Sequence, residues 1–148
     1  FVVGDEEKHT PHTLVLADRS SNETVLLSEA PGRQLGRTPD AMRVSFVDKS
    51  DPKHWVVAAI APDEAQATVL VDTPQGMVDE KEQDRSEDYC WLPDGSLMMA
   101  KGSYLLRWSG KQGEGFQNFT EIAGLNGDIK RLAVSPDGKY IAVVVQSK

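Results

Sequence analysis

Charged and amide side chains recur at a fixed distance before three copies of one turn motif, and they are the side chains of this chain best suited to bind a ligand. The turns are Pro39-Asp40-Ala41, Pro93-Asp94-Gly95 and Pro136-Asp137-Gly138. Two such residues stand five and six positions before each turn Pro, and one further cation lies close to the first turn. The candidate ligand-binding residues are therefore Arg33, Gln34, Arg37, Glu87, Asp88, Lys130 and Arg131.

These residues allow two interpretations. If their strands begin at one rim, they form a mixed-charge surface that can bind a protein, a peptide or a small polar ligand, because loops on a rigid frame converge there. The alternative is a set of ordinary solvated strand ends that form ion pairs with one another. The sequence leaves both interpretations open.

No other group of residues predicts catalysis or metal binding. Cys90 shares no motif with a histidine or an asparagine, which would activate a thiol nucleophile. The histidines His9, His12 and His54 have no spacing typical of a metal site. Ser103 follows a glycine, but the second glycine of a Gly-x-Ser-x-Gly nucleophile elbow is missing. We therefore expect no catalytic residue, no metal site and no cofactor.

The turns belong to a repeat that must position these side chains. Each turn lies between two short apolar runs, and its Pro and Asp are typical of a hairpin. Pro93 and Pro136 are 43 residues apart, whereas Pro39 and Pro93 are 54 apart. A polar, acidic insertion at 77–85 accounts for most of the difference. A period of about 40 to 45 residues with four short strands is typical of β-propeller blades such as WD40-like repeats.

The sequence thus predicts an all-β fold, a partial β-propeller with about three four-stranded antiparallel blades. The expected blade boundaries lie near 1–31, 32–75, 86–124 and 128–148. Small residues stand three positions before each turn Pro, namely Gly36, Cys90 and Ala133. We expect them at the axis, where innermost strands crowd together. Because a ring typically needs four to eight blades, the remaining blades must come from further sequence or from a second copy, and further sequence is the simpler source.

Composition limits the partners. The 148 residues carry a formal net charge of −7 at pH 7, which disfavours nucleic acid and anionic membranes. No apolar run approaches the roughly 20 residues of a transmembrane segment. The single cysteine rules out an internal disulfide and leaves the redox compartment open.

The segments 132–142 and 91–97 resemble the Pro-Asp-Gly repeats of TolB-like six-bladed propellers. The stretches 36–38 and 86–89 are also similar to uncharacterised secreted bacterial members of that group. The resemblance covers essentially the whole chain, although Ala41 replaces the turn glycine. It implies half of a six-bladed ring, a periplasmic or secreted location, and binding of a protein or ligand without a cofactor.

Two functional hypotheses follow. The first is a non-catalytic binding scaffold that uses the propeller rim and is not an enzyme. The alternative is the propeller portion of an enzyme, such as the gating domain of a prolyl oligopeptidase-like serine peptidase, which requires a separate hydrolase domain. A purely structural role through exposed strand edges is a third possibility.

Overall fold

The computed structural model describes residues 2–3, 12–22, 24–51, 54–64, 66–74, 88–121 and 127–147, and every regular element in these ranges is a strand. No helix in them is long and apolar enough to cross a membrane. The strands are β1 (Val2–Val3), β2 (Thr13–Ala17), β3 (Thr24–Ser28), β4 (Pro31–Arg37), β5 (Val44–Asp48), β6 (Val56–Ile60), β7 (Thr68–Asp72), β8 (Tyr89–Trp91), β9 (Leu97–Lys101), β10 (Tyr104–Trp108), β11 (Gln117–Glu121), β12 (Gly127–Val134) and β13 (Ile141–Ser147).

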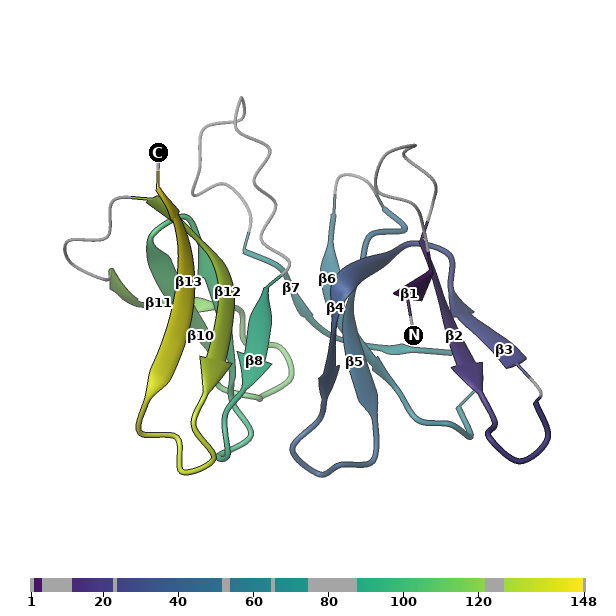
Figure 1. Ribbon diagram of the computed structural model, residues 1–148. Coiled ribbons are helices and arrows are strands. Elements are labelled where there is room, and N and C mark those ends of the chain that lie inside the picture. The colour runs from purple at the N-terminus through teal and green to yellow at the C-terminus, as the bar shows by residue number, and fades with distance from the viewer. Residues whose placement is uncertain are drawn as a thin grey trace.

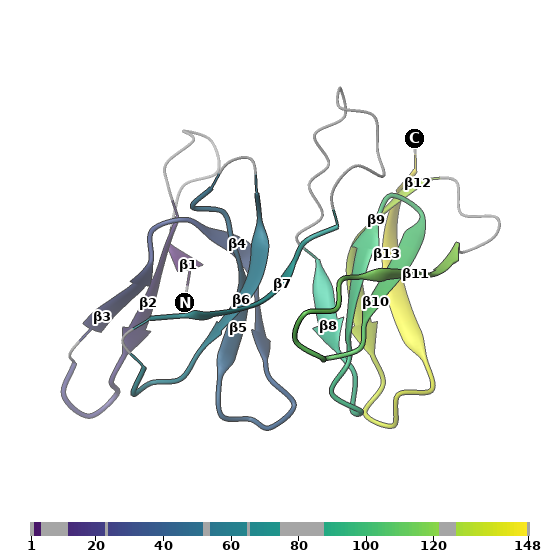
Figure 2. The same ribbon diagram turned by 180° about the vertical axis from the view of Figure 1, so that it is seen from behind.

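The strands form four antiparallel sheets in chain order. The second and third sheets have four strands each, ordered β4-β5-β6-β7 and β8-β9-β10-β11. The first sheet contains β1-β2-β3 and the fourth contains β12-β13. Figures 1 and 2 show the sheets side by side, with β8 lying between β4 and β12, which it contacts. This is the arrangement of a β-propeller, so the expected all-β fold class is confirmed.

The strand registers place equivalent residues of successive sheets on equivalent faces. Gly36 pairs with Ser45 in the second sheet, as Cys90 pairs with Met98 in the third and Ala133 with Ala142 in the fourth. Because side chains alternate along a strand, these pairs share the face that points to the following sheet. The neighbouring pairs point to the preceding sheet and are Leu35 with Phe46, Tyr89 with Met99, and Leu132 with Val143.

The hydrophobic core is divided into three layers, each between two successive sheets. The layer between the first and second sheets holds Leu14 and Phe46. The layer between the second and third holds Val47, Tyr89 and Trp108 among others. The layer between the third and fourth holds residues of β9, β10 and β12. Every sheet is therefore stabilised mainly by its neighbours, as expected for a propeller.

The second and third sheets interlock around Ser45. Its hydroxyl accepts a hydrogen bond from Nε1 of Trp91 at 2.9 Å and lies 3.0 Å from the hydroxyl of Tyr89. Tyr89 is fully buried, and this burial raises its pKa to about 12. A Cβ on Gly36 would lie 2.8 Å from Oγ of Ser45 and 2.9 Å from Cε2 of Tyr89. Gly36 is therefore small because Tyr89, on the innermost strand of the next sheet, occupies the adjacent space.

The Pro-Asp turns share one hydrogen-bonding scheme. Oδ1 of Asp94 accepts bonds from the backbone N–H and the hydroxyl of Ser96, at 2.9 and 2.6 Å. Asp40 accepts from the hydroxyl of Thr38, and Asp137 from that of Ser135. The residue after each Asp has a positive φ, which Gly95 and Gly138 adopt freely and Ala41 adopts at 61°.

We expect Gly36→Ala to lower the free energy of unfolding by about 1 to 3 kcal/mol, because the added methyl group must displace Tyr89 or Ser45. Chemical denaturation measures this change. Gly115→Ala is the matched control, since nothing lies within 4 Å of its Cβ position. Equal stability of the two variants would contradict the interlock between the sheets.

Stability should fall in acid because of the turn carboxylates. Hydrogen bonds, chiefly from the Ser96 side chain, hold the pKa of Asp94 below its ordinary value of 3.8. A carboxylate with a lowered pKa stabilises the fold above its unfolded-state pKa, and this contribution is lost as the pH falls through the folded-state pKa. Asp94→Asn should cost less than about 1 kcal/mol near pH 7, because the Asp94 side chain is 54% exposed and solvent screens its interactions. It should also make the loss of stability below about pH 4 smaller. Denaturation midpoints across this range measure both effects, and an unchanged acid slope would contradict the assignment.

Candidate functional site

Charged side chains gather where the innermost strands β8 and β12 begin, opposite the Pro-Asp turns. Asp88 immediately precedes β8, and its carbonyl accepts a hydrogen bond from the N–H of Ala100, which places the end of β9 beside it. The N–H of Ile129 donates to the carbonyl of Gly102 and draws the start of β12 to the same place. We call this set the strand-start site, and its charged members are Asp88, Lys101, Asp128, Lys130 and Arg131.

The central contact of the strand-start site is an ion pair between two sheets. Nη1 of Arg131 lies 2.7 Å from Oδ1 of Asp88, and it also donates to the carbonyl of Lys130 at 2.9 Å. The Asp88 side chain is 14% exposed, whereas that of Arg131 is 63% exposed. The guanidinium therefore faces solvent while it holds a mostly buried carboxylate. Nζ of Lys130 lies 4.0 Å from Oδ2 of Asp128, so cations and carboxylates alternate here.

Lys101 is a buried cation that sequence reasoning did not select. It ends β9 directly after four buried residues, and its Nζ donates to the carbonyl of Pro74 at 2.7 Å. Desolvation lowers its pKa. A lysine that continues an apolar strand pattern is the signal that could have drawn attention to it.

The structure separates the seven predicted ligand-binding residues. Asp88, Lys130 and Arg131 come together at the strand-start site, whereas Glu87 lies outside the described residues, as does the insertion at 77–85. The side-chain amide of Gln34 donates to the backbone carbonyl of Tyr89 and accepts from its N–H, so it joins the second and third sheets. Arg33 is exposed on β4, and Arg37 lines a different feature.

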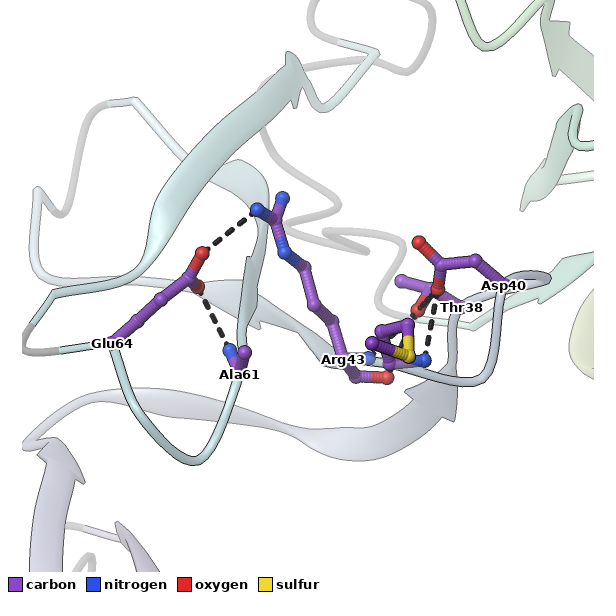
Figure 3. Close-up of polar contacts among 6 residues, drawn as sticks. Thr38, Asp40, Arg43, Ala61 and Glu64 are labelled. Carbon is purple, nitrogen blue, oxygen red and sulfur yellow. Dashed lines mark hydrogen bonds and ion pairs between the residues drawn. The ribbon is translucent and has the colours of Figure 1, made fainter.

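That feature is a groove of about 400 Å³ between the first and second sheets, with a largely apolar lining. We call it the inter-sheet groove. Its lining includes Leu16, Leu27, Leu35, Arg37, Met42, Arg43, Val44 and Ile60. Figure 3 shows that Arg43 is held by Glu64, with 2.7 Å between Nη2 and Oε1, while Oε2 accepts from the N–H of Ala61. The carboxylate of Glu64 is thus already bound by Arg43 and by the backbone of Ala61. The inter-sheet groove therefore suits an apolar surface better than a reacting substrate.

Cys90 and the potential metal ligands form no cluster among the described residues. Burial raises the pKa of the Cys90 thiol to about 11, which keeps it protonated and unreactive at neutral pH. Within the described part of the chain, no three His, Cys, Asp or Glu side chains are grouped so that they could hold a metal ion. His54 instead lies 3.4 Å from Asp72.

Comparison with known proteins gives a structural match only. No family model and no curated protein sequence matches the chain. Among solved structures, a gluconolactonase from Xanthomonas campestris aligns with a TM-score of 0.60 over 93% of this chain at 12% identity. The alignment covers 43% of that enzyme, so the chain spans less than half of it. Because that enzyme has a six-bladed propeller fold, the match supports the β-propeller architecture.

The match corrects one expectation. We expected a non-catalytic binding scaffold that is not an enzyme, but a solved structure that shares this architecture is an enzyme. At 12% identity the match shows a shared fold, and the alternative, the propeller portion of an enzyme, remains a proposal. A peptidase gating domain, the specific form of that alternative, is not tested by it. Sequence reasoning failed because the repeat encodes the fold, and one fold hosts many activities.

Two of the predicted residues should differ in their effect on stability. We expect Gln34→Ala to cost about 1 to 3 kcal/mol, because it leaves backbone groups of Tyr89 without their partner. Arg131→Ala should cost about 1 kcal/mol, because the exposed guanidinium contributes little itself but its loss leaves the 14% exposed carboxylate of Asp88 with one partner fewer. Urea denaturation of both variants gives the comparison. If Arg131→Ala is the more damaging change, the strand-start site is chiefly structural.

Proposed function

We propose that this chain forms part of a propeller enzyme that hydrolyses a small polar ester, such as a lactone of a sugar acid, at the strand-start site. The observation that carries the proposal is the shared architecture with the Xanthomonas campestris gluconolactonase over 93% of the chain. The ion pair of Asp88 and Arg131 supplies a base and an oxyanion-binding donor at the end of the sheets where the chain before β8, the end of β9 and the start of β12 lie close together.

The proposed step is attack of water on the ester carbonyl carbon. Asp88 takes one proton from the water as the new C–O bond forms. The N–H groups of Arg131 that face solvent donate to the developing oxyanion, while Lys101 and Lys130 add positive potential. Collapse of the tetrahedral intermediate breaks the bond to the ring oxygen, and the proton passes from Asp88 to that oxygen. The products are an acid and an alcohol within one opened molecule.

A central divalent metal is another means by which a propeller enzyme can activate water. The described residues offer no group of three or more potential ligands. The equivalent innermost-strand positions hold Gly36, Cys90 and Ala133, which supply no oxygen side-chain ligand. The described residues therefore do not fit a metal site by themselves, and the proposed step assigns the base to Asp88.

The proposal also covers the family relationship of the chain, the chemical class of its ligand and its cellular location. The Pro-Asp-Gly turns support a place for the chain among TolB-like propellers, and with it a periplasmic or secreted location. The mixed charges of the strand-start site suit a small polar ligand with hydroxyl and carbonyl groups. Detection of the native protein in a periplasmic extract would test the location.

Hydrolysis of δ-gluconolactone, followed by the proton that the product acid releases, tests the activity. We expect turnover above the uncatalysed rate, which Asp88→Asn should reduce in kcat/KM by about 100-fold. Arg131→Gln should also lower kcat/KM by about 100-fold through loss of the oxyanion donor. Glu114→Gln is the control, because its exposed ion pair with Lys111 lies away from the strand-start site.

Two results would overturn parts of this proposal. Folded protein, verified by circular dichroism, that hydrolyses neither δ-gluconolactone nor a panel of aryl esters would remove the proposed activity. Activity that survives both Asp88→Asn and Arg131→Gln would remove the strand-start site as its location.

A further inference from the structure

Strand β12 contains one extra residue where it enters the strand-start site. Its ladder with β13 pairs Ile129 with Val145, and the next pair is Arg131 with Val144. Lys130, which lies between the two pairs, is therefore the extra residue of a β-bulge. A bulge bends its strand and redirects nearby side chains, and bulges are over-represented next to active sites.

The buried side chains of β12 agree with this bulge. Ile129 and Leu132 are both buried in the layer between the third and fourth sheets. Residues three apart on a regular strand point to opposite faces, so one extra residue between them is needed to bury both. If Lys130 were removed, the pairs on either side of it would join into an unbroken ladder in the same register.

Arg131 reaches the third sheet although its strand position points away from it. The next residue, Leu132, is buried against the third sheet, and adjacent residues of a strand point to opposite faces. The guanidinium must therefore turn back across β12 to place Nη1 2.7 Å from Oδ1 of Asp88. The same Nη1 donates to the main-chain carbonyl of Lys130 at 2.9 Å. The bulge residue thus supplies a second acceptor that orients the guanidinium.

We propose that Lys130 is a positioning residue, whose main-chain carbonyl holds Arg131 beside Asp88 and so aims the guanidinium at the ligand. Nη1 uses its two N–H groups on Asp88 and Lys130, so the donor to the developing oxyanion is Nη2 or Nε. The benefit to catalysis rests on the proposed function, whereas the restraint on Arg131 does not. The amine of Lys130 is separate from this role, because its Nζ lies 4.0 Å from Oδ2 of Asp128.

Two variants separate the bulge from the lysine amine. Removal of Lys130 eliminates the bulge and keeps the register on both sides of it, whereas Lys130→Ala keeps the bulge and removes only the amine. In the protein without substrate, NMR of the arginine side-chain nitrogens measures rotation of the Arg131 guanidinium, and Arg131→Gln assigns its signals. We expect slow rotation in the wild type and in Lys130→Ala. Removal of Lys130 should make rotation about 10-fold faster, because one hydrogen bond to a charged group is lost.

A third variant tests the carbonyl contact without a change in chain length. In Asp88→Ala the ion pair is gone, but the carbonyl of Lys130 still accepts from Arg131. Arg131 should therefore still rotate about 10-fold more slowly than Arg19, which is exposed. Circular dichroism verifies that each variant is folded.

Kinetics with δ-gluconolactone test the benefit to catalysis. Removal of Lys130 should lower kcat about 100-fold, the loss expected for Arg131→Gln, and should change KM far less, because an oriented oxyanion donor acts on the transition state. Lys130→Ala should lower kcat by less than about 10-fold, since it keeps the carbonyl that orients the donor.

The two measurements distinguish failure of the positioning role from failure of the proposed activity. Three results would overturn the positioning role even if the lactone is hydrolysed: fast rotation of Arg131 in the folded wild type, slow rotation that survives removal of Lys130, and rotation as fast as that of Arg19 in Asp88→Ala. Slow rotation that is lost with the bulge supports the restraint on Arg131. If no variant and no wild-type protein hydrolyses the lactone, the proposed activity fails and the restraint stands.

Discussion

The structure depends on the packing of each sheet against the next. In the layer between the second and third sheets, the large Tyr89 lies over the small pair of Gly36 and Ser45. Since protein interiors are close-packed, a single methyl group added at such a position lowers the stability of the fold. Each of the three core layers is therefore formed separately, by the side chains of two adjacent sheets.

This packing also separates the two ends of the molecule. The innermost strands run in the same direction, so their starting residues collect at one end and the Pro-Asp turns at the other. The turn carboxylates are occupied with local hydrogen bonds to Thr38, Ser96 and Ser135. The carboxylate of Asp88 is instead held by Arg131 of the next sheet. Carboxylates are thus bound within a single turn at one end and shared between two sheets at the other.

The positions of the two surfaces relative to the core layers explain why the inter-sheet groove is apolar and the strand-start site is polar. The inter-sheet groove is lined by residues that every complete layer buries, so it resembles an unfilled layer more than a substrate pocket. The strand-start site lies beyond the end of the layers, where main-chain carbonyls such as that of Pro74 remain to bind Lys101. The apolar groove and the charged strand-start site therefore occupy different parts of the molecule.

Sequence by itself determined the all-β class, the repeat and the turns, because Pro-Asp turns and alternating apolar runs are local signals that act within a few residues. It also singled out Asp88 and Arg131 as equivalent positions in successive units. It did not distinguish Gln34, which binds the backbone of Tyr89, from Arg131, which faces solvent, nor did it identify Tyr89 as the neighbour that keeps Gly36 small. Those differences were decided by the tertiary structure, because the neighbour that sets each side chain's role lies 40 or more residues away and reaches it only when two sheets pack.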